Sequence, residues 1–146
     1  MRAVVQRVSS ASVLVDKKEI SSIGQGLLVL IGISREDSEK QALAMAKKIC
    51  HLRIFTNEEG KMAHSIIDLG YELLLVSQFT LYGDVHSGRR PDFLQAAAPE
   101  KAESLFDRVV TECRVLCTKE PKTGSFGAKM EVQLVNDGPV TLWVDV

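Results

Sequence analysis

The sequence lacks the features of a membrane protein, a secreted protein or a disulfide-stabilised protein. No window approaches the ~18 consecutive apolar residues of a membrane span. The opening MRAVVQRVSS interrupts its apolar residues with Gln6 and Arg7, so it has no apolar core of a signal peptide. The cysteines number three, and an odd count suggests reduced thiols. We therefore expect a cytoplasmic protein with no membrane contact.

Metal-ligand patterns and a strong basic charge are also missing. Cys113 and Cys117 have no ligand-like spacing to the three histidines, so we predict no metal and no cofactor. The formal net charge of −1 gives no global electrostatic case for binding nucleic acid. Any RNA contact would have to use local basic groups, of which Arg89 and Arg90 are candidates and a solvated turn is the alternative.

The residues that are present predict one α+β domain over 1–146, since 45% of them are hydrophobic and can close one core. Helices are expected over about 37–50, after the capping-box-like pair Ser34 and Asp37, and over 99–113, which begins at Pro99. Strands are expected at 2–8, 12–15, 26–33, 52–55, 72–81, 114–118, 128–135 and 140–145. The run 26–33 is apolar throughout, which is typical of a strand buried on both faces.

The strand 72–81 ends in polar side chains. Ser77 and Thr80 stand near its end with Gln78 between them, and strand ends often present polar groups to a cleft. The alternative is that these side chains merely satisfy backbone groups. No histidine or acidic partner is evident in the sequence, and a hydroxyl without an adjacent base is a weak nucleophile.

Two further stretches have an unusual backbone chemistry. In TGSFGAKM, Gly124 and Gly127 flank Phe126, so the ring could stack on a base, or it could be tucked into the core beneath a glycine loop. In LVNDGPVTLWV, the four residues 136–139 look like a hairpin turn between apolar strands. Pro139 would remove an N–H from the returning strand, which instead favours a rigid backbone device at a working surface.

Four segments together resemble the D-aminoacyl-tRNA deacylases, also called D-tyrosyl-tRNA(Tyr) deacylases. They are SQFTLYGD (77–84), GRRPDF (88–93), TGSFGAKM (123–130) and NDGPVT (136–141), and the likeness covers essentially the whole chain. The resemblance implies a homodimer of mainly antiparallel, barrel-like domains with packed helices and with active sites at the subunit interface. It also implies hydrolysis of the ester that joins a D-amino acid, or glycine, to the 3′-terminal adenosine of tRNA.

The resemblance also implies roles for particular residues. Gly138-Pro139 would be a cis peptide inserted into the partner's active site, with Arg7 orienting its carbonyls. The catalytic pocket would be lined by Ser77, Gln78 and Thr80, and the terminal adenine would lie near Phe126 and Gly127. Backbone N–H groups at Phe79 and Thr80 could stabilise the oxyanion.

This chemistry does not need an activated side-chain nucleophile. The neighbouring 2′-OH or a positioned water can attack the ester, and we favour that mechanism over attack by Thr80. Rigid carbonyls near Cα could exclude an L-side chain. Two other functions stay open: a non-catalytic RNA-binding module that uses Arg89, Arg90 and Phe126, and an amidohydrolase acting on free D-amino acid derivatives.

Overall fold

The computed structural model describes residues 1–86 and 88–146. In chain order the elements are β1 (Arg2–Val15), β2 (Lys18–Ile23), β3 (Gly26–Gly32), α1 (Glu39–His51), β4 (Phe55–Thr56), β5 (Met62–His64), α2 (Ile66–Leu69), β6 (Glu72–Ser77), the 3₁₀ turn η1 (Phe79–Tyr82), α3 (Pro99–Leu116), β7 (Lys122–Thr123) and β8 (Met130–Asp145). The predicted α+β class is confirmed.

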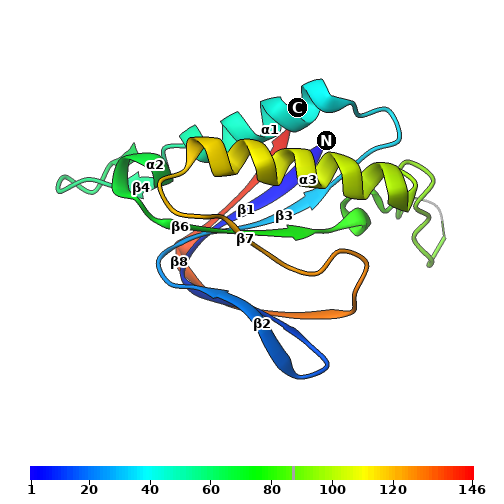
Figure 1. Cartoon of the computed structure of the whole chain (residues 1–146), viewed down its shortest axis with the longest axis horizontal. Helices are drawn as coiled ribbons and strands as arrows, with labels where there is room; N and C mark the ends of the chain where they lie inside the picture. The colour runs from blue at the N-terminus through cyan, green and yellow to red at the C-terminus, as the bar shows by residue number, and fades with distance from the viewer. Residues whose placement is uncertain (87) are drawn as a thin grey trace.

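One mixed sheet, nearly closed on itself, contains β1, β2, β3, β6, β7 and β8, while β4 and β5 pair separately (Figure 1). β1 is the centre of the mixed sheet, since β8 pairs antiparallel along one edge while β3 and β2 share the other edge. β6 then adds parallel to β3, and β7 parallel to β6. The Lys122 ammonium on β7 donates to the Ser22 carbonyl on β2, which brings the two ends of the sheet together. The sheet is therefore barrel-like and mainly antiparallel, as expected.

Two cores lie on the two faces of this sheet. α1 and α3 run side by side across one face (Figure 1). Along β3, Leu27, Val29 and Ile31 pack beneath these helices, while Leu28 and Leu30 belong to the core inside the barrel. Because side chains alternate along a strand, a strand with a core on each face must be apolar throughout. This explains the unbroken apolar run that predicted a doubly buried strand.

Several predicted boundaries are wrong. The strands expected at 2–8 and 12–15 are one continuous strand, β1. The strand expected at 52–55 is reduced to Phe55–Thr56, which pairs with β5. The strand expected at 114–118 does not form, because α3 continues to Leu116 and its last turn packs Leu116 and Cys117 against the helical core.

The strand predicted over 72–81 ends at Ser77. The Gln78 N–H donates to the Ile31 carbonyl at 2.7 Å, and the chain then tightens into η1, whose bonds include Gly83 N–H to the Thr80 carbonyl at 2.9 Å. The polar side chains therefore lie on a turn that β3 and β6 hold in place, rather than on a strand.

The hairpin predicted at 136–139 does not exist. β8 pairs with β1 both before and after these residues, so the chain does not reverse direction there. The separate strands expected at 128–135 and 140–145 are consequently one strand with an irregular segment in its middle. The pattern that predicts a turn therefore marks a bulge within one continuous strand.

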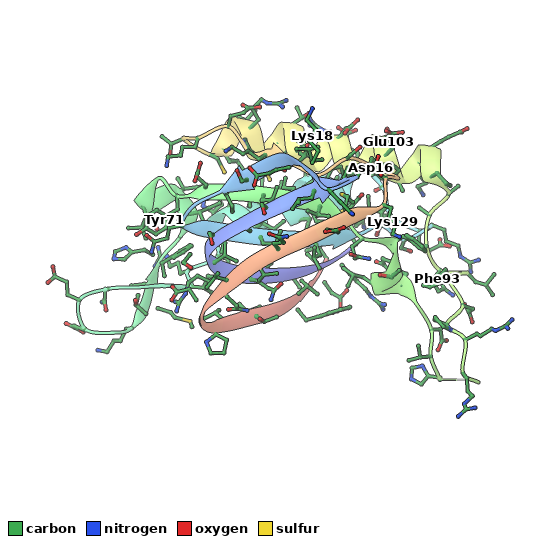
Figure 2. All side chains as sticks on the ribbon, turned by 90° about the horizontal axis from the view of Figure 1, so that it is seen from below. Asp16, Lys18, Tyr71, Phe93, Glu103 and Lys129 are labelled. Atoms are coloured by element: carbon green, nitrogen blue, oxygen red, sulfur yellow. The ribbon has the colours of Figure 1, made fainter. Side chains whose placement is uncertain are left out.

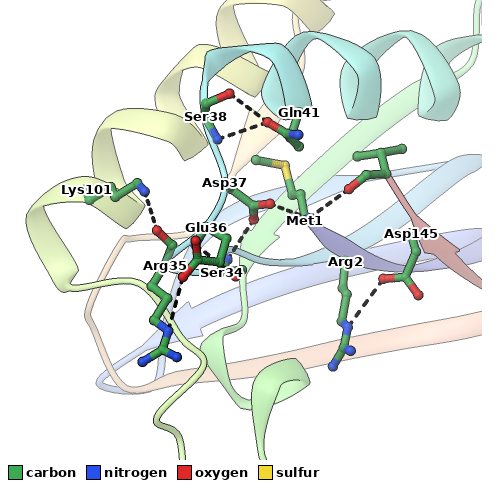
Figure 3. A network of polar contacts seen from close by, with 11 residues as sticks. Met1, Arg2, Ser34, Arg35, Glu36, Asp37, Ser38, Gln41, Lys101 and Asp145 are labelled. Carbon is green, nitrogen blue, oxygen red and sulfur yellow. Dashed lines mark hydrogen bonds and ion pairs between the residues drawn. The ribbon is translucent and has the colours of Figure 1, made fainter.

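A polar network holds the 34–38 turn against the start of the chain, next to β1, and against the start of α3 (Figure 3). Asp37 accepts from the Ser34 N–H at 2.7 Å and from the Met1 amino group at 2.6 Å. The Lys101 ammonium on α3 donates to the Arg35 carbonyl at 2.5 Å. The Ser34–Asp37 pair thus closes a turn, and α1 begins only at Glu39, with Ser38 as its N-cap.

Candidate functional site

A cavity of about 730 Å³ opens where β3, β6, η1 and the start of α3 meet the segment before β8. Its wall is largely apolar, with the polar edge supplied by the end of β6. The lining residues are Ile31, Ile33, Val76, Ser77, Gln78, Phe79, Phe93, Ala96, Ala97, Ala98, Pro99, Ala102, Phe126, Gly127, Ala128, Met130 and Val132. An apolar cavity with a few convergent polar groups is the usual form of a small-ligand site.

The structure brings five of the predicted residues together around this cavity: Ser77, Gln78, Phe79, Phe126 and Gly127 all line it. Thr80 lies next to it, and its Oγ1 accepts a hydrogen bond from the Gln78 side-chain amide.

The turn η1 begins with Phe79, which lines the cavity, and its first backbone N–H groups differ from the later ones in their bonds. Its 3₁₀ bonds use the N–H groups of Leu81 and Gly83, while the leading N–H groups, of Phe79 and Thr80, have no acceptor within a 3₁₀ turn that starts there. Within the described residues, neither donates to a backbone carbonyl outside the turn. They are therefore able to donate to a ligand oxygen.

Aromatic rings form two sides of the cavity. Phe79 is 56% exposed, and its ring centroid lies 5.0 Å from that of Phe93 in an edge-to-face pair. Figure 2 labels Phe93 beside η1. Phe126 is half-buried, with its centroid 6.3 Å from that of Phe106 on α3. The Phe126 ring thus packs on the core, as one alternative predicted, and it also lines the cavity, while its stacking on a base stays a prediction.

The remaining predicted residues lie apart from the cavity. Among the described residues, the cavity wall includes neither Arg7 nor Gly138 nor Pro139. Gly138 and Pro139 are exposed in the irregular segment of β8, and the peptide bond between them is cis. One chain therefore carries two separate groups of predicted residues.

Arg7 connects the β8 bulge to the body of the protein. Although charged, its side chain is buried, and its Nη1 donates to the Ile54 carbonyl at 2.6 Å. Its Nε donates to the Asp137 carbonyl at 3.0 Å and forms an ion pair with the Asp137 carboxylate at 3.2 Å. A Cβ on Gly138 would lie only 2.8 Å from Arg7 Nη2, so glycine is required there both for this approach and for its φ of +127°.

Arg89 and Arg90 are exposed in the loop between η1 and α3. Asp84 and Asp92 close this loop by reciprocal backbone bonds of 2.8 and 3.0 Å. Ser87, inside the predicted phosphate-contact stretch 86–93, lies outside the described residues. The His86 backbone N–H and ring hold the pKa of the Asp84 carboxyl below its usual value.

Sequence reasoning missed one part of the cavity wall. Ala96, Ala97 and Ala98 form it just before α3, and the Ala97 N–H bond to the Ile33 carbonyl at 2.9 Å holds it against the end of β3. The run of small residues ending in Pro99 was visible, and it could have suggested a close approach of backbone to a ligand.

The described residues add two findings on other classes of function. No group of three or more His, Cys, Asp or Glu side chains within 1–86 and 88–146 is arranged to hold a metal ion. Over the same residues, no helix combines the length and apolar character needed to span a bilayer.

Comparison with known proteins assigns the chain to a family. The family model described as D-Tyr-tRNA(Tyr) deacylase matches residues 4–145. A D-aminoacyl-tRNA deacylase from Desulfatibacillum aliphaticivorans is 54% identical over 145 residues, which cover 99% of each protein. One from Thermomicrobium roseum is 52% identical over 99% of this chain and 94% of the relative.

Solved structures share the fold of this chain. A structure titled c-Myc DNA Unwinding Element Binding Protein matches with a TM-score of 0.94 and 45% identity, over 100% of this chain and 99% of the other. A probable eukaryotic D-amino acid tRNA deacylase matches with a TM-score of 0.83 over 99% of this chain and 98% of the other, and at 24% identity it supports the fold alone. The resemblance seen in the sequence is confirmed, and the chain belongs to the D-Tyr-tRNA(Tyr) deacylase family.

Proposed function

We propose that the protein hydrolyses the ester joining a D-amino acid, or glycine, to the 3′-terminal adenosine of tRNA, and that it rejects L-aminoacyl-tRNA. The observation that carries this proposal is the cavity, which gathers Ser77–Phe79 and Phe126–Gly127 in a chain of this family. A cavity of this size has room for an aminoacyl-adenosine end but not for a folded RNA. Such a substrate places the site of action in the cytoplasm.

The chemistry follows from the groups at the cavity edge. A water, positioned with the help of the ribose 2′-OH, attacks the ester carbonyl. The tetrahedral intermediate then collapses by breaking the bond to the 3′-oxygen, which takes up the proton that the water loses, so that the free amino acid and the tRNA are released. The free N–H groups of Phe79 and Thr80 donate to the oxyanion. Because positioning makes the attack nearly unimolecular, no covalent enzyme intermediate is needed.

Thr80 is a poor candidate for the nucleophile. Its hydroxyl accepts from the Gln78 amide, which cannot take up a proton. No histidine, carboxylate or lysine among the described residues forms a hydrogen bond to it. An unactivated hydroxyl at neutral pH attacks an ester slowly.

We propose further that the site is completed by a second copy of the chain. Gly138 and Pro139 protrude from β8 and are separate from their own cavity. β8 exposes apolar side chains on both sides of this bulge: Leu134, Val135, Leu142 and Trp143. Exposed apolar groups on an edge strand are suited to burial against a partner. In this arrangement the Gly138-Pro139 carbonyls enter the partner's cavity and leave no room for an L-side chain.

The adenosine end and the tRNA backbone have separate contacts in this proposal. The Phe126 ring stacks on the terminal adenine, and the Arg89-Arg90 loop contacts phosphates. With a net charge of −1, affinity for tRNA must come from such local contacts rather than from the whole surface.

One assay tests the activity against its alternatives. Purified protein is incubated with D-tyrosyl-tRNA, L-tyrosyl-tRNA and the methyl ester of free D-tyrosine. We expect rapid hydrolysis of the D-tyrosyl-tRNA alone. Comparable hydrolysis of the free ester would support the amidohydrolase, and tRNA binding without turnover would support the binding module. The double variant Gln78→Ala with Phe126→Ala, which removes two side chains from the cavity wall, serves as the inactive control once circular dichroism shows that it is folded.

A further inference from the structure

The bulge in β8 is unusually large for a β-strand. Val8 of β1 pairs with Asn136, and Gln6 pairs with Thr141, so Arg7 alone faces the four residues 137–140. An ordinary bulge opposes two residues to one. The extra backbone lifts Gly138 and Pro139 out of the sheet. Contacts other than the bonds between strands must therefore hold residues 137–140 in place.

The Asn136 side chain spans the base of this bulge. Its Oδ1 accepts from the Val140 N–H at 2.8 Å, and its Nδ2 donates to Thr141 Oγ1 at 2.8 Å. Only one orientation of the amide satisfies both partners, since a backbone N–H must meet the carbonyl oxygen. Thr141 Oγ1 also accepts from the Gln6 side chain of β1 at 3.4 Å. The amide therefore takes the place of the ladder bonds that the bulge interrupts.

The bulge has a second, independent anchor at its other end. Arg7 holds the Asp137 carbonyl, and Arg7 itself is held by the Ile54 carbonyl. Beyond the bulge, the Val140 side chain is buried in the core. Gly138 and Pro139 are exposed between these two anchors. The backbone of Gly138 and Pro139 is thus held on one side by the Arg7 bond to Asp137 and on the other side by the Asn136 bond to Val140.

We propose that Asn136 is a positioning residue for chiral selection: it sets the orientation in which Gly138 and Pro139 are presented to the substrate. This inference rests on the proposed function. Without the Asn136 amide, the partly buried Val140 N–H loses its partner and the end of the bulge is released. Arg7 still holds Asp137, and the Val140 side chain is still buried in the core. We therefore expect D/L selectivity to be lost while the fold remains.

The test compares Asn136→Ala with two other variants in single-turnover deacylation of D- and L-tyrosyl-tRNA. We expect Asn136→Ala to lower the ratio of D to L rates at least ~10-fold. Asn136→Asp should retain most of the ratio, because a carboxylate can accept from the Val140 N–H and from the Thr141 hydroxyl. The matched control is Asn57→Ala, which removes a similar amide from the exposed turn between β4 and β5, where Asn57 accepts from two backbone N–H groups.

Hydrogen exchange provides a readout that does not depend on activity. In Asn136→Ala the Val140 amide should exchange at least ~10-fold faster, while amides in the centre of β1 keep their protection. Native protection of Val140 would show that Asn136 does not hold the bulge. An unchanged ratio of D to L rates in Asn136→Ala would show that Asn136 has no part in chiral selection, whatever the exchange rate of Val140. Either result overturns the inference. If the wild type itself fails to discriminate, the proposed function fails, and the exchange measurement still tests the anchor.

Discussion

At the scale of single residues, close backbone approaches decide which glycines are indispensable. Gly26 starts β3 opposite Glu72 of β6, and a Cβ on Gly26 would lie 1.9 Å from the Glu72 carbonyl oxygen. Backbone atoms of paired strands cannot move apart cheaply. The nearby Gly24 differs, since its added Cβ would meet only the flexible end of the Glu72 side chain, at 3.3 Å.

We therefore predict that Gly26→Ala lowers the free energy of unfolding by roughly 3 kcal/mol or prevents folding. Gly24→Ala, the matched control, should stay within about 1 kcal/mol of the wild type. Urea unfolding followed by far-UV circular dichroism measures both. Equal stabilities of the two variants would contradict the close approach.

A second residue-scale prediction concerns pH. Burial, with a further contribution from the Asp37 carboxylate, raises the pKa of Tyr82 to about 12. Between pH 10 and 12 the native state therefore holds a proton that the unfolded chain has lost. The stabilisation of the native state by this proton is complete below about pH 10. As the pH rises to about 12 it is lost, and the free energy of unfolding falls by roughly 2–3 kcal/mol.

Absorbance at 295 nm, which follows tyrosinate, tests this in the folded protein. The sequence has only two tyrosines, so Tyr82→Phe should remove the transition near pH 12. Tyr71→Phe should leave that transition in place. A wild-type titration completed near pH 10 would disprove the shift.

At the scale of elements, the proposed mechanism depends on the backbone of the turn η1 more than on any side chain of that turn. The turn carries the free N–H groups of Phe79 and Thr80 to the cavity edge, and the Gln78 N–H bond to the Ile31 carbonyl fixes where it starts. Backbone donors cannot be removed by truncating a side chain. The activity should therefore tolerate changes to the hydroxyl of Thr80.

We predict that Thr80→Ala retains deacylation within ~10-fold of the wild type. Single-turnover rates on D-tyrosyl-tRNA measure this, with Thr56→Ala, an exposed threonine of β4, as the control. A loss of ~10³-fold or more in a folded Thr80→Ala protein would instead indicate a nucleophile.

Elements also show where prediction from the sequence failed. The Asp-Gly-Pro pattern predicts a hairpin, because local residues define a turn but not its partner strand. Pairing of β8 with β1 on both sides of the signal turned it into a bulge. Likewise, Ser34 and Asp37 have the spacing of a capping box, yet their bonds close a turn that the Met1 amino group also holds.

At the scale of the whole molecule, a chain that separates its cavity from its Gly138-Pro139 bulge is expected to complete its site in trans. Gly138→Ala disrupts the bulge, because the new Cβ would lie 2.8 Å from Arg7 Nη2 and 2.9 Å from Val140 Cγ2. Gln78→Ala with Phe126→Ala disrupts the cavity instead. Each variant should be inactive or unselective by itself.

We predict that mixing these two variants, with refolding to exchange subunits, restores about one quarter of the wild-type difference between the D and L rates, which neither variant shows by itself. Half of the dimers formed are mixed, and each mixed dimer has one intact site of two. Sedimentation analysis establishes that dimers are present. No recovery in a sample containing mixed dimers would place cavity and bulge of one site on the same chain.

The sequence by itself determined what depends on nearest neighbours along the chain. Its alternating and continuous apolar runs predicted strand character in β1, β6 and β8 and the doubly buried β3, and the i, i+3, i+4 pattern after Pro99 predicted α3. Its motif residues led to the family. Only the tertiary structure decided which motifs meet. β3 and β6 bring η1 beside Ala96–Ala98 and Phe126, whereas pairing with β1 lifts Gly138-Pro139 away from that cavity. These relations depend on strand pairing between distant segments, and pairing is set by the packing of the whole core rather than by local residues.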